Sequence, residues 1–479
     1  MRVVVIGAGF GGLAVARALH RAGERDLLVL DRAPRVGGTW QANTYPGVAC
    51  DAPSHLYRFS DVPAAWSRRF APGAEIGAYL ERCAEPVREH LRLGCGVRSA
   101  RWTGRAWELV LDDGTTEVAD VLVAATGKLS APRVPDLPGL AGAGVRVVHT
   151  ARWPADLDLT GRRVVVVGTG ASAVQVVPAV ADDAAHVTVL QRSAPYVLDK
   201  PDRVYAERWR ALHEQVPVVP VLSRLLVRAA FEAFGTFFWR WPRLMRLLER
   251  RHAQQLTRDV ADPALRVALT PTDRAGCKRP LISSDWHRTL ARPDVSLVTS
   301  PAVRVDHDTV VTADGRRHPA DVLVLATGFR TEEPLADLPV EGPRGSLAQR
   351  WSRGPHAHLG ISVPGFPNLF CVYGPGTNLG AGSIVDVLEA QAEHVVDAVR
   401  LLGERPGHAL EVSEEALATH EAWRERRLRR SVWTTGCTSW YLDATGRDVH
   451  NWPATVAAYR RQARRVDPTA YRFVALRGS

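Results

Sequence analysis

The stretch VVVIGAGFGGLAVARAL, residues 3–19, decides the fold. An apolar run typical of a buried strand ends at Gly7, and apolar residues at helical spacing follow Gly12. Gly7, Gly9 and Gly12 form the pattern G-x-G-x-x-G, which permits a tight turn and lets the backbone of a helix N-terminus approach a pyrophosphate. A second apolar run ends at Asp31, 19 residues after Gly12, where an acid accepts hydrogen bonds from ribose hydroxyls. The stretch therefore predicts a Rossmann-like unit that binds an unphosphorylated dinucleotide.

The same pattern recurs at residues 162–180, RRVVVVGTGASAVQVVPAV, where Gly168, Gly170 and Ala173 hold the glycine positions. The next apolar run leads to Arg192, again 19 residues on, so a base stands where the first unit has an acid. An arginine pairs with a 2′-phosphate that a carboxylate would repel, which favours NADPH in this unit. Alternatively, Arg192 is an ordinary surface arginine at a strand end. The residues expected to contact NADPH are Gly168, Thr169, Gly170, Ala171, Ser172, Arg192 and Ser193.

Two further strands, ADVLVAATGK at 119–128 and ADVLVLATGF at 320–329, resemble each other and each ends in Ala-Thr-Gly. Such returning strands close the dinucleotide units of flavoproteins that bind two dinucleotides. We therefore predict an α/β protein with two Rossmann-like domains, one for FAD and one for NADPH, the second inserted in the first. The expected segments are 1–145 (FAD domain, first part), 150–328 (NADPH domain), and 329–479 (FAD-domain return and tail).

Residues 204–270 form a helical insertion in the NADPH part, with aromatic residues, leucines and arginines at helical spacing. One interpretation is a helix whose apolar face packs on the core or over a substrate channel. The other is a weak interfacial association with a membrane surface. No run in the sequence is long and apolar enough to predict a membrane span.

The chain of 479 residues has 61 basic and 51 acidic residues, and the basic ones are almost all arginine spread along the chain. This distribution, with no nucleic-acid motif, argues against a nucleic-acid partner. The six cysteines show no paired spacing, which predicts a reduced, cytoplasmic enzyme with neither a disulfide framework nor a metal site. Cys50 has no cysteine within several residues, which excludes a disulfide reductase with a redox pair at that position.

Five segments resemble the Baeyer–Villiger monooxygenases, which are FAD- and NADPH-dependent class B flavoprotein monooxygenases. They are GGTWQANTYPGVACD (37–51), HTARWP (149–154), GCKRPLISSDWHRTL (276–290), NLFCVYGPGTNLGAGSI (368–384) and SVWTTGCTSWYLDATGRDVHNWP (431–453). The resemblance covers nearly the whole chain, and its tail is most similar to the shorter branch that includes aryl-ketone-oxidising members. It implies that NADPH reduces FAD, that O2 adds at flavin C4a to give a peroxide, and that the peroxide converts a ketone into an ester or lactone.

The resemblance also implies roles for single residues. Arg279 becomes the central catalytic group, because a permanent cation stabilises negative charge on the peroxide and on its adduct. Asp51 orients Arg279, and Lys278 meets the 2′-phosphate with Arg192. The remaining implied positions are Thr39, Trp40, Gln41 and Tyr57 along the flavin, Trp433 (with Trp440 as the alternative) at NADP, and His149 and Trp153 at the hinge between the domains.

One motif departs from the family pattern. The full fingerprint begins F-x-G-x-x-x-H, but Ala143 and Val145 occupy the Phe and Gly positions before His149. N- or S-oxygenation of an amine or sulfide on the same scaffold is therefore an alternative. A redox-inert flavoprotein that only binds dinucleotides is a second one.

Overall fold

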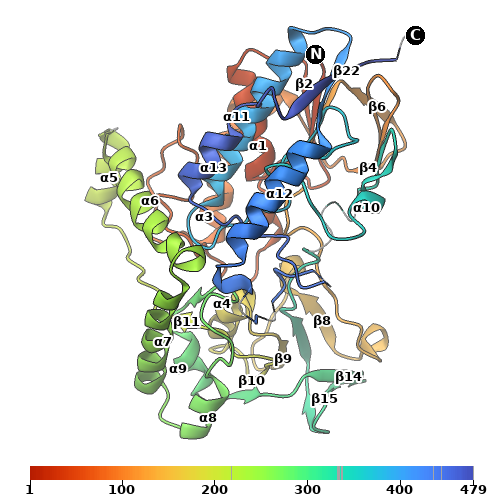
Figure 1. Cartoon of the computed structure of the whole chain (residues 1–479). Coiled ribbons are helices and arrows are strands. Elements are labelled where there is room, and N and C mark those ends of the chain that lie inside the picture. The colour runs from red at the N-terminus through yellow and green to blue at the C-terminus, as the bar shows by residue number, and fades with distance from the viewer. Residues whose placement is uncertain are drawn as a thin grey trace.

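The computed structural model describes residues 1–216, 218–331, 335, 338–434, 436–437, 439–443 and 445–477 (Figure 1). Its first sheet is parallel, with the strand order β20-β7-β1-β2-β3. The strands are β1 (Val3–Ile6), β2 (Leu27–Asp31), β3 (Leu91–Leu93), β7 (Val121–Ala124) and β20 (Leu369–Cys371). β1 is short, wholly apolar and buried, as expected for the centre of a parallel sheet with helices on its faces.

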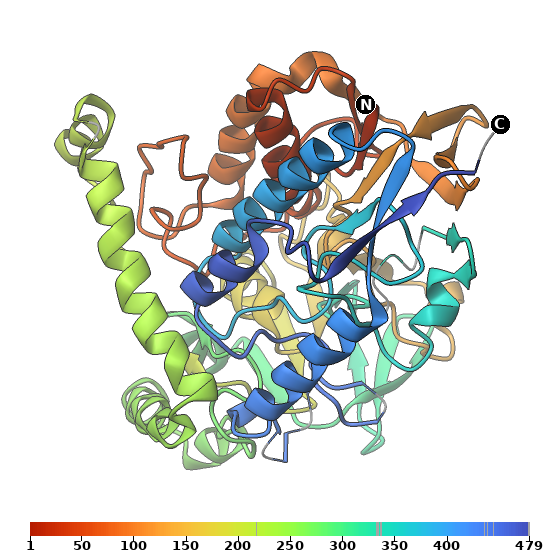
Figure 2. The ribbon, with the colours of Figure 1, turned by 45° about the horizontal axis from the view of Figure 1, so that its top comes forward.

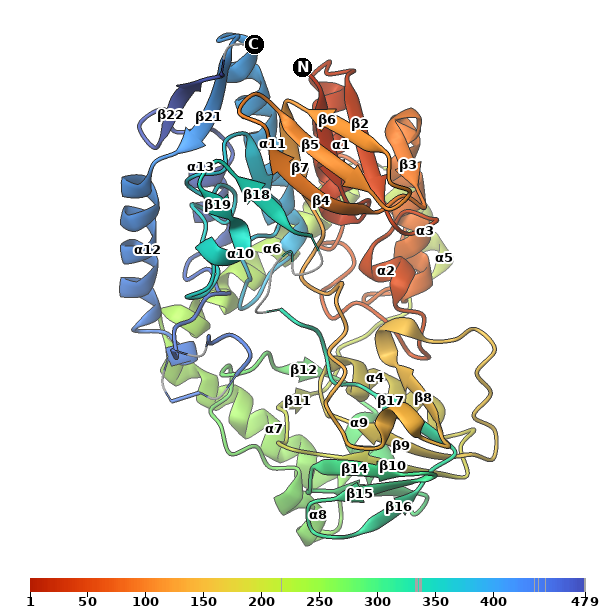
Figure 3. The same cartoon turned by 90° about the vertical axis from the view of Figure 1, so that its right-hand side faces the viewer.

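Helix α1 (Phe10–Arg21) follows β1 directly and packs lengthwise on α11 (Ile384–Gly403), which comes from the end of the chain. Figure 3 shows these two helices beside the first sheet, with α3 (Gly73–Ala84) nearby. The first sheet is therefore built from both ends of the chain, because β20 and α11 return to it after a long excursion.

The excursion contains the second parallel sheet, with the strand order β13-β10-β9-β17-β8. Its strands are β8 (Arg146–His149), β9 (Arg163–Val167), β10 (His186–Leu190), β13 (Val295–Val298) and β17 (Val322–Leu325). Helices α4 (Ala171–Val180) and α9 (Trp286–Leu290) pack together beside it. The predicted α/β class with a second Rossmann-like sheet inserted in the first is confirmed, whereas the exact segment boundaries stay predictions.

Smaller elements complete both halves. A mixed sheet joins β4 (Val97–Trp102), β5 (Trp107–Leu111), β6 (Thr116–Ala119), β18 (Val340–Gly342) and β19 (Gly345–Ser346). A three-stranded sheet joins β14 (Ala302–Asp306), β15 (Thr309–Thr312) and β16 (Arg317–Pro319). The C-terminal part adds β21 (His408–Val412), α12 (Glu414–Leu428), α13 (Val456–Ala463) and β22 (Tyr471–Ala475).

The predicted insertion is helical. It contains α5 (Glu207–Gln215), α6 (Val218–Trp239), the 3-10 helix η4 (Pro242–Met245), α7 (Arg246–Asp259) and α8 (Pro263–Ala268). In Figures 1 and 2, α5 and α6 run along one side of the molecule and α7 continues beside the second sheet. Among the described residues, no helix has the length and apolar character needed to cross a membrane.

The expectation that the cysteines form no disulfide is wrong. Cys277 and Cys437 are joined by a disulfide with 5.3 Å between their Cα atoms, although 160 positions separate them. Their spacing gave no signal because only the tertiary fold brings the Lys278 segment beside the C-terminal tail. Four cysteines, Cys50, Cys83, Cys95 and Cys371, are free.

Candidate active site

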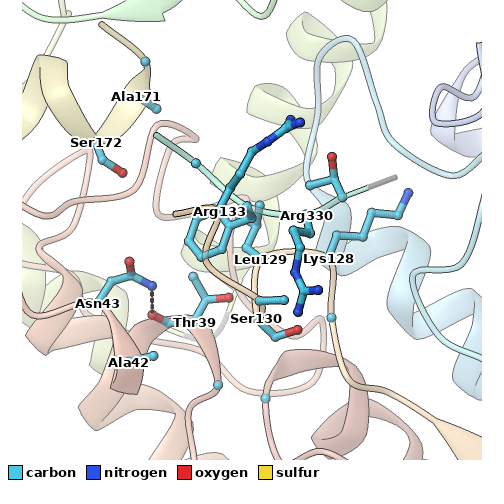
Figure 4. A pocket seen from close by; sticks show the side chains of 18 of the residues that line it. Thr39, Ala42, Asn43, Lys128, Leu129, Ser130, Arg133, Ala171, Ser172 and Arg330 are labelled. Atoms are coloured by element: carbon cyan, nitrogen blue, oxygen red, sulfur yellow. Dashed lines mark hydrogen bonds between the residues drawn. The ribbon is translucent and has the colours of Figure 1, made fainter. Parts of the chain in front are cut away.

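A cavity of about 1420 Å³ lies between the two sheets. Both glycine loops line it, as do residues that follow β7 and β17 and residues of the returning chain. Figure 4 shows side chains from four separate segments around it, including Thr39, Lys128, Ser172 and Arg330. Ligands of parallel α/β sheets bind at this carboxyl edge of the strands.

The first glycine loop is closely packed, and it ends at Gly9, the residue before α1. Gly7 has φ of +109°, and a Cβ there would lie 2.4 Å from the carbonyl oxygen of Ala125. Asp31 ends β2, where its carboxylate accepts hydrogen bonds from the backbone N–H groups of Ala8 (2.6 Å) and Ala33 (2.8 Å). The acid therefore stands against the loop at the edge of the cavity, where a ribose next to the loop would reach it.

The second glycine loop brings two cations together. Thr169 donates from its hydroxyl to the carbonyl of Ser193 (2.9 Å), which ties the loop to the segment after β10. Lys278 lies 3.1 Å from the Ser193 hydroxyl and 3.1 Å from the Asp273 carboxylate. Arg192, exposed and next to Ser193, lines the same part of the cavity. Arg192 and Lys278 thus both line the cavity, one next to Ser193 in the chain and the other at its hydroxyl, and two cations of this kind suit a phosphate.

The loop at residues 43–51 connects the two halves. Tyr45 donates from its hydroxyl to the side-chain oxygen of Gln175 in α4 (2.9 Å), and the Gln175 amide donates to the carbonyl of Ala49 (2.9 Å). Gly47 has φ of +81°, and a Cβ there would lie 2.6 Å from the Gln175 carbonyl oxygen, so only glycine fits. The loop therefore docks on the first helix of the second sheet.

Asp51, at the end of this loop, meets Arg279. Nε of Arg279 lies 2.8 Å from Oδ2 of Asp51, and Nη2 donates to Oδ1 at 3.0 Å. This bidentate contact fixes the plane of the guanidinium as well as its position. The negative charge of Asp51 raises the pKa of Arg279 further above its ordinary value, so the group stays a cation. Both residues line the cavity, and 228 positions separate them in the chain.

The predicted flavin contacts lie in one short helix and its support. Thr39, Trp40 and Gln41 belong to α2 (Thr39–Ala42), and all three line the cavity. The Trp40 ring nitrogen donates to the Tyr57 hydroxyl at 3.2 Å, and the two rings meet edge to face with centroids 5.7 Å apart. Tyr57 therefore holds Trp40 as well as lining the cavity.

The two residues predicted at the hinge lie where the chain enters the second sheet. His149 ends β8, is buried, and accepts the N–H of Ala151 at its Nδ1 (3.1 Å). Burial lowers the pKa of His149, so it is neutral at pH 7. The Trp153 carbonyl accepts from the Thr44 hydroxyl at 3.4 Å, which adds a contact between the two halves.

Comparison with known proteins agrees with this geometry. Residues 1–230 match the family described as pyridine nucleotide-disulphide oxidoreductase. A Baeyer–Villiger monooxygenase of Streptomyces coelicolor is 42% identical, over 99% of this chain and 93% of that protein. One of Pseudomonas aeruginosa is 37% identical, over 98% of this chain and 91% of that protein. The chain belongs to the Baeyer–Villiger monooxygenases.

The solved structures agree with this assignment. Oxidized steroid monooxygenase bound to NADP superimposes with a TM-score of 0.87 at 31% identity, over 99% of both chains. Cyclohexanone monooxygenase from Rhodococcus sp. Phi1 bound to NADP+ gives 0.86 at 28% identity, over 99% of both chains. The predicted fold class and the predicted enzyme class, an FAD- and NADPH-dependent Baeyer–Villiger monooxygenase, are confirmed.

One predicted site residue of this Baeyer–Villiger monooxygenase lies elsewhere. Trp433 is 1% exposed and stacks on Phe238 of α6, with ring centroids 5.8 Å apart, in a hydrophobic cluster. It is not among the described residues that line the cavity, whereas Trp440 and Tyr441 are. Trp433 thus packs against the helical insertion, while the alternative tail tryptophan, Trp440, lines the cavity; which of the two contacts NADP stays a prediction.

Sequence reasoning missed one polar group that lines the cavity. Lys128, directly after the first Ala-Thr-Gly, is buried with its Nζ 4.7 Å from the centroid of the Tyr373 ring. Its Nζ has no hydrogen-bond partner among the described residues, and burial lowers the pKa of Lys128 to about 7. Tyr373 has φ of 61° and donates from its hydroxyl to Asn378 at 3.2 Å. The signal that was available is the place of Lys128 at the carboxyl end of a parallel strand.

The one group of described residues with metal-ligand geometry lies apart from the cavity lining. His20, Glu89 and His90 have ligand atoms within 4.8 Å of one another, and the two histidine rings share a 3.3 Å contact.

The incomplete fingerprint lies before β8, where a Cβ at Gly144 would lie 2.6 Å from the His307 ring. Gly144 thus lies against the exposed His307 ring, one place from the expected glycine position.

Proposed function

We propose that this monooxygenase converts a ketone into an ester or a lactone. In each turnover NADPH, a proton, O2 and the ketone give NADP+, water and a product with one oxygen inserted between the carbonyl carbon and a neighbouring carbon. The observation that carries this proposal is the Asp51–Arg279 pair, which lies in the cavity that both glycine loops line.

FAD is proposed to lie along the first sheet. Its pyrophosphate meets the N-terminus of α1 at Gly9, where no side chain blocks the backbone, and its ribose meets Asp31. Bound and reduced, FAD supplies the electrons that activate O2. The residues proposed to contact it are Gly7, Gly9, Gly12, Asp31, Thr39, Trp40, Gln41 and Tyr57.

NADPH is proposed to lie along the second sheet. Its pyrophosphate would meet the N-terminus of α4, and its 2′-phosphate would be held by Arg192 and by Lys278, which contacts the Ser193 hydroxyl. The residues proposed to contact it are Gly168, Thr169, Gly170, Ala171, Ser172, Arg192, Ser193 and Lys278. His149 and Trp153 are proposed to couple the two halves, since the Trp153 carbonyl already contacts Thr44.

Arg279 is proposed as the catalytic cation. Negative charge develops on the carbonyl oxygen as the ketone is attacked, and a guanidinium held in a fixed plane stabilises it without having to reorganise. Arg279 cannot act as a proton donor at neutral pH, because Asp51 raises its already high pKa. The phenols of Tyr373 and Tyr441 stay protonated, since burial raises the pKa of Tyr373 to about 12 and the pKa of Tyr441 higher still. They are the neutral groups beside this cation.

The test compares wild type with Arg279→Ala and Arg279→Lys, using an aryl ketone and a cyclic ketone. Both variants should bind FAD, as the visible absorption spectrum reports, and Arg279→Ala should form no ester or lactone. Arg279→Lys keeps the charge but loses the bidentate fork, so it should retain a small fraction of the activity. Ester formation by Arg279→Ala at the wild-type rate would overturn the assigned role. If wild type oxygenates only a sulfide or an amine in the same assay, the ketone is the wrong substrate class.

A further inference from the structure

The first half of helix α6 presents an aliphatic face to solvent, while charged side chains of the helix contact the protein. Arg224, 7% exposed, pairs with Asp386 at 2.5 Å. Glu232 accepts the backbone N–H groups of Val456 and Ala457, at 3.1 and 2.9 Å. An ordinary amphipathic surface helix buries its apolar stripe, whereas α6 buries its aromatic end, with Phe238 against Trp433.

The outward side of α6 is an aliphatic stripe. Five side chains on it are between 53% and 64% exposed, and they recur every three to four positions along the helix: Val218, Val221, Leu222, Leu225 and Leu226. Ala229, Ala230 and Ala233 continue the exposed positions by one or two turns. An exposed apolar surface this continuous marks a place that something else covers.

Tryptophans and arginines stand at both ends of the stripe. Before it, α5 carries the exposed Trp209 between Arg208 and Arg210. After it, Trp241 is 53% exposed, and three exposed arginines surround it in the chain, one before it and two after it. These arginines are Arg240, Arg243 and Arg246. Aromatic residues at the rims and arginines around an apolar stripe suit the boundary between lipid headgroups and acyl chains.

We infer that α5 and α6 dock this protein on an anionic lipid surface, with α6 lying in the plane of the interface. The chain carries a formal charge of +10, and Glu232, the one acid of α6, accepts backbone N–H groups of the protein, so the stripe and its arginine rims complement a negatively charged surface. A second copy of the chain would bring the same arginines opposite one another, which disfavours self-association. A spanning mode is ruled out for the described helices, because none is long and apolar enough.

The docking surface lies close to the active-site cavity. Gly235, on the inner side of α6, lies opposite Ala381, with 3.6 Å between a Cβ built at the glycine and the Ala381 carbonyl oxygen. Leu379 and Gly382, on either side of that residue, line the cavity. One layer of chain therefore separates the lipid-facing helix from the place where substrate binds. The docking itself does not depend on which substrate the cavity takes.

The test is co-sedimentation of the FAD-loaded protein with vesicles. Vesicles of phosphatidylglycerol and phosphatidylcholine in equal parts should bind wild type and release it in high salt, which screens the arginines. Vesicles of phosphatidylcholine alone should bind it more weakly. The double variant Leu222→Ser/Leu225→Ser should bind the anionic vesicles at least about tenfold more weakly, because each serine removes an aliphatic side chain from the lipid contact.

A matched variant separates the stripe from general surface hydrophobicity. Val118→Ser/Val267→Ser changes two exposed valines outside α6, 54% and 76% exposed, and should bind like wild type. NADPH oxidation without vesicles should be equal in all three proteins, which shows that they are folded. Failure of wild type to bind anionic vesicles, or equal binding by the Leu222 and Leu225 variant, would overturn the inference. A wild-type dimer that this variant dissociates, without vesicle binding, would assign the stripe to self-association instead.

Discussion

Replacing Asp51 by asparagine tests the ion pair that organises the cavity. The substitution keeps the shape of the side chain, removes its charge, and puts an N–H donor opposite one of the two arginine donors. The wild-type contacts are 2.8 and 3.0 Å long. Arg279 therefore loses both the attraction and the geometry that hold its guanidinium in one plane.

The size of the effect follows from the charges and their exposure. Two unit charges about 4 Å apart attract by about 4 kcal/mol at an effective dielectric constant of about 20. The two side chains are 37% and 35% exposed, so solvent in the cavity screens the pair, and about half of that energy is a fair expectation. A loss of about 2 kcal/mol in the transition state lowers kcat about 30-fold.

The assay measures ester formation and NADPH oxidation together. Asp51→Asn should lower the yield of ester per NADPH and raise the release of hydrogen peroxide, because reduced enzyme keeps reacting with oxygen while the ketone step slows. Asp51→Glu, which keeps the charge, should lose less. As a control, Asp199→Asn breaks a comparable pair with Arg258 on the surface (2.9 Å) and should leave kcat and the yield unchanged. An Asp51→Asn enzyme with wild-type kcat and wild-type yield would refute this reasoning.

Three further outcomes follow from the geometry. Arg192→Ala should raise KM for NADPH by about tenfold or more and leave KM for NADH nearly unchanged, because the proposed charge-assisted contact to the 2′-phosphate is lost. An equal change in KM for both cofactors would contradict that contact. Cys277→Ser removes the disulfide to Cys437 and should lower the free energy of unfolding by about 2–5 kcal/mol in oxidising buffer. After reduction the variant and wild type should be equally stable. A stability difference that persists in reductant would point to another cause. Lys128→Met should stabilise the cofactor-free protein by about 3 kcal/mol near pH 7 and by much less near pH 10, measured by denaturant unfolding. The pKa of Lys128 is about 7 in the folded protein and 10.5 ordinarily, so between these values the unfolded wild-type chain binds more protons than the folded one. The free energy of unfolding of wild type therefore rises with pH, and the advantage of the methionine variant shrinks. A difference between the two proteins that does not depend on pH would contradict this reasoning.

The parts of the fold that the sequence predicted are those that depend on short spacings. A strand, a glycine turn, a helix and a second strand lie within about thirty residues, so the place of Asp31 and Arg192 at strand ends follows from the local pattern. The pairing of Asp51 with Arg279 spans 228 positions. Only the resemblance to a family predicted it, because no local pattern encodes a contact between two sheets.

The features that the sequence missed or left open depend on tertiary packing. Cys277 and Cys437 look unpaired in the sequence and meet only when the tail closes over the Lys278 segment. Trp433 and Trp440 cannot be told apart from the sequence, yet Trp433 packs on Phe238 and Trp440 lines the cavity. The outward stripe of α6 has the ordinary period of an amphipathic helix, and the sequence does not tell which side of such a helix faces the protein.

The docking of the loop at residues 43–51 on α4 has a mechanical consequence. The Gln175 side chain is hydrogen-bonded to this loop at Tyr45 and Ala49, and Asp51 follows only two residues after Ala49. A rotation of the second half that carries α4 along would therefore also displace the loop at residues 43–51, which positions the Asp51 carboxylate. Arg279 would move with the rotating half. Because Asp51 follows the first half's glycine unit in the chain and Arg279 belongs to the second half, a change in the angle between the halves would change the geometry of this ion pair.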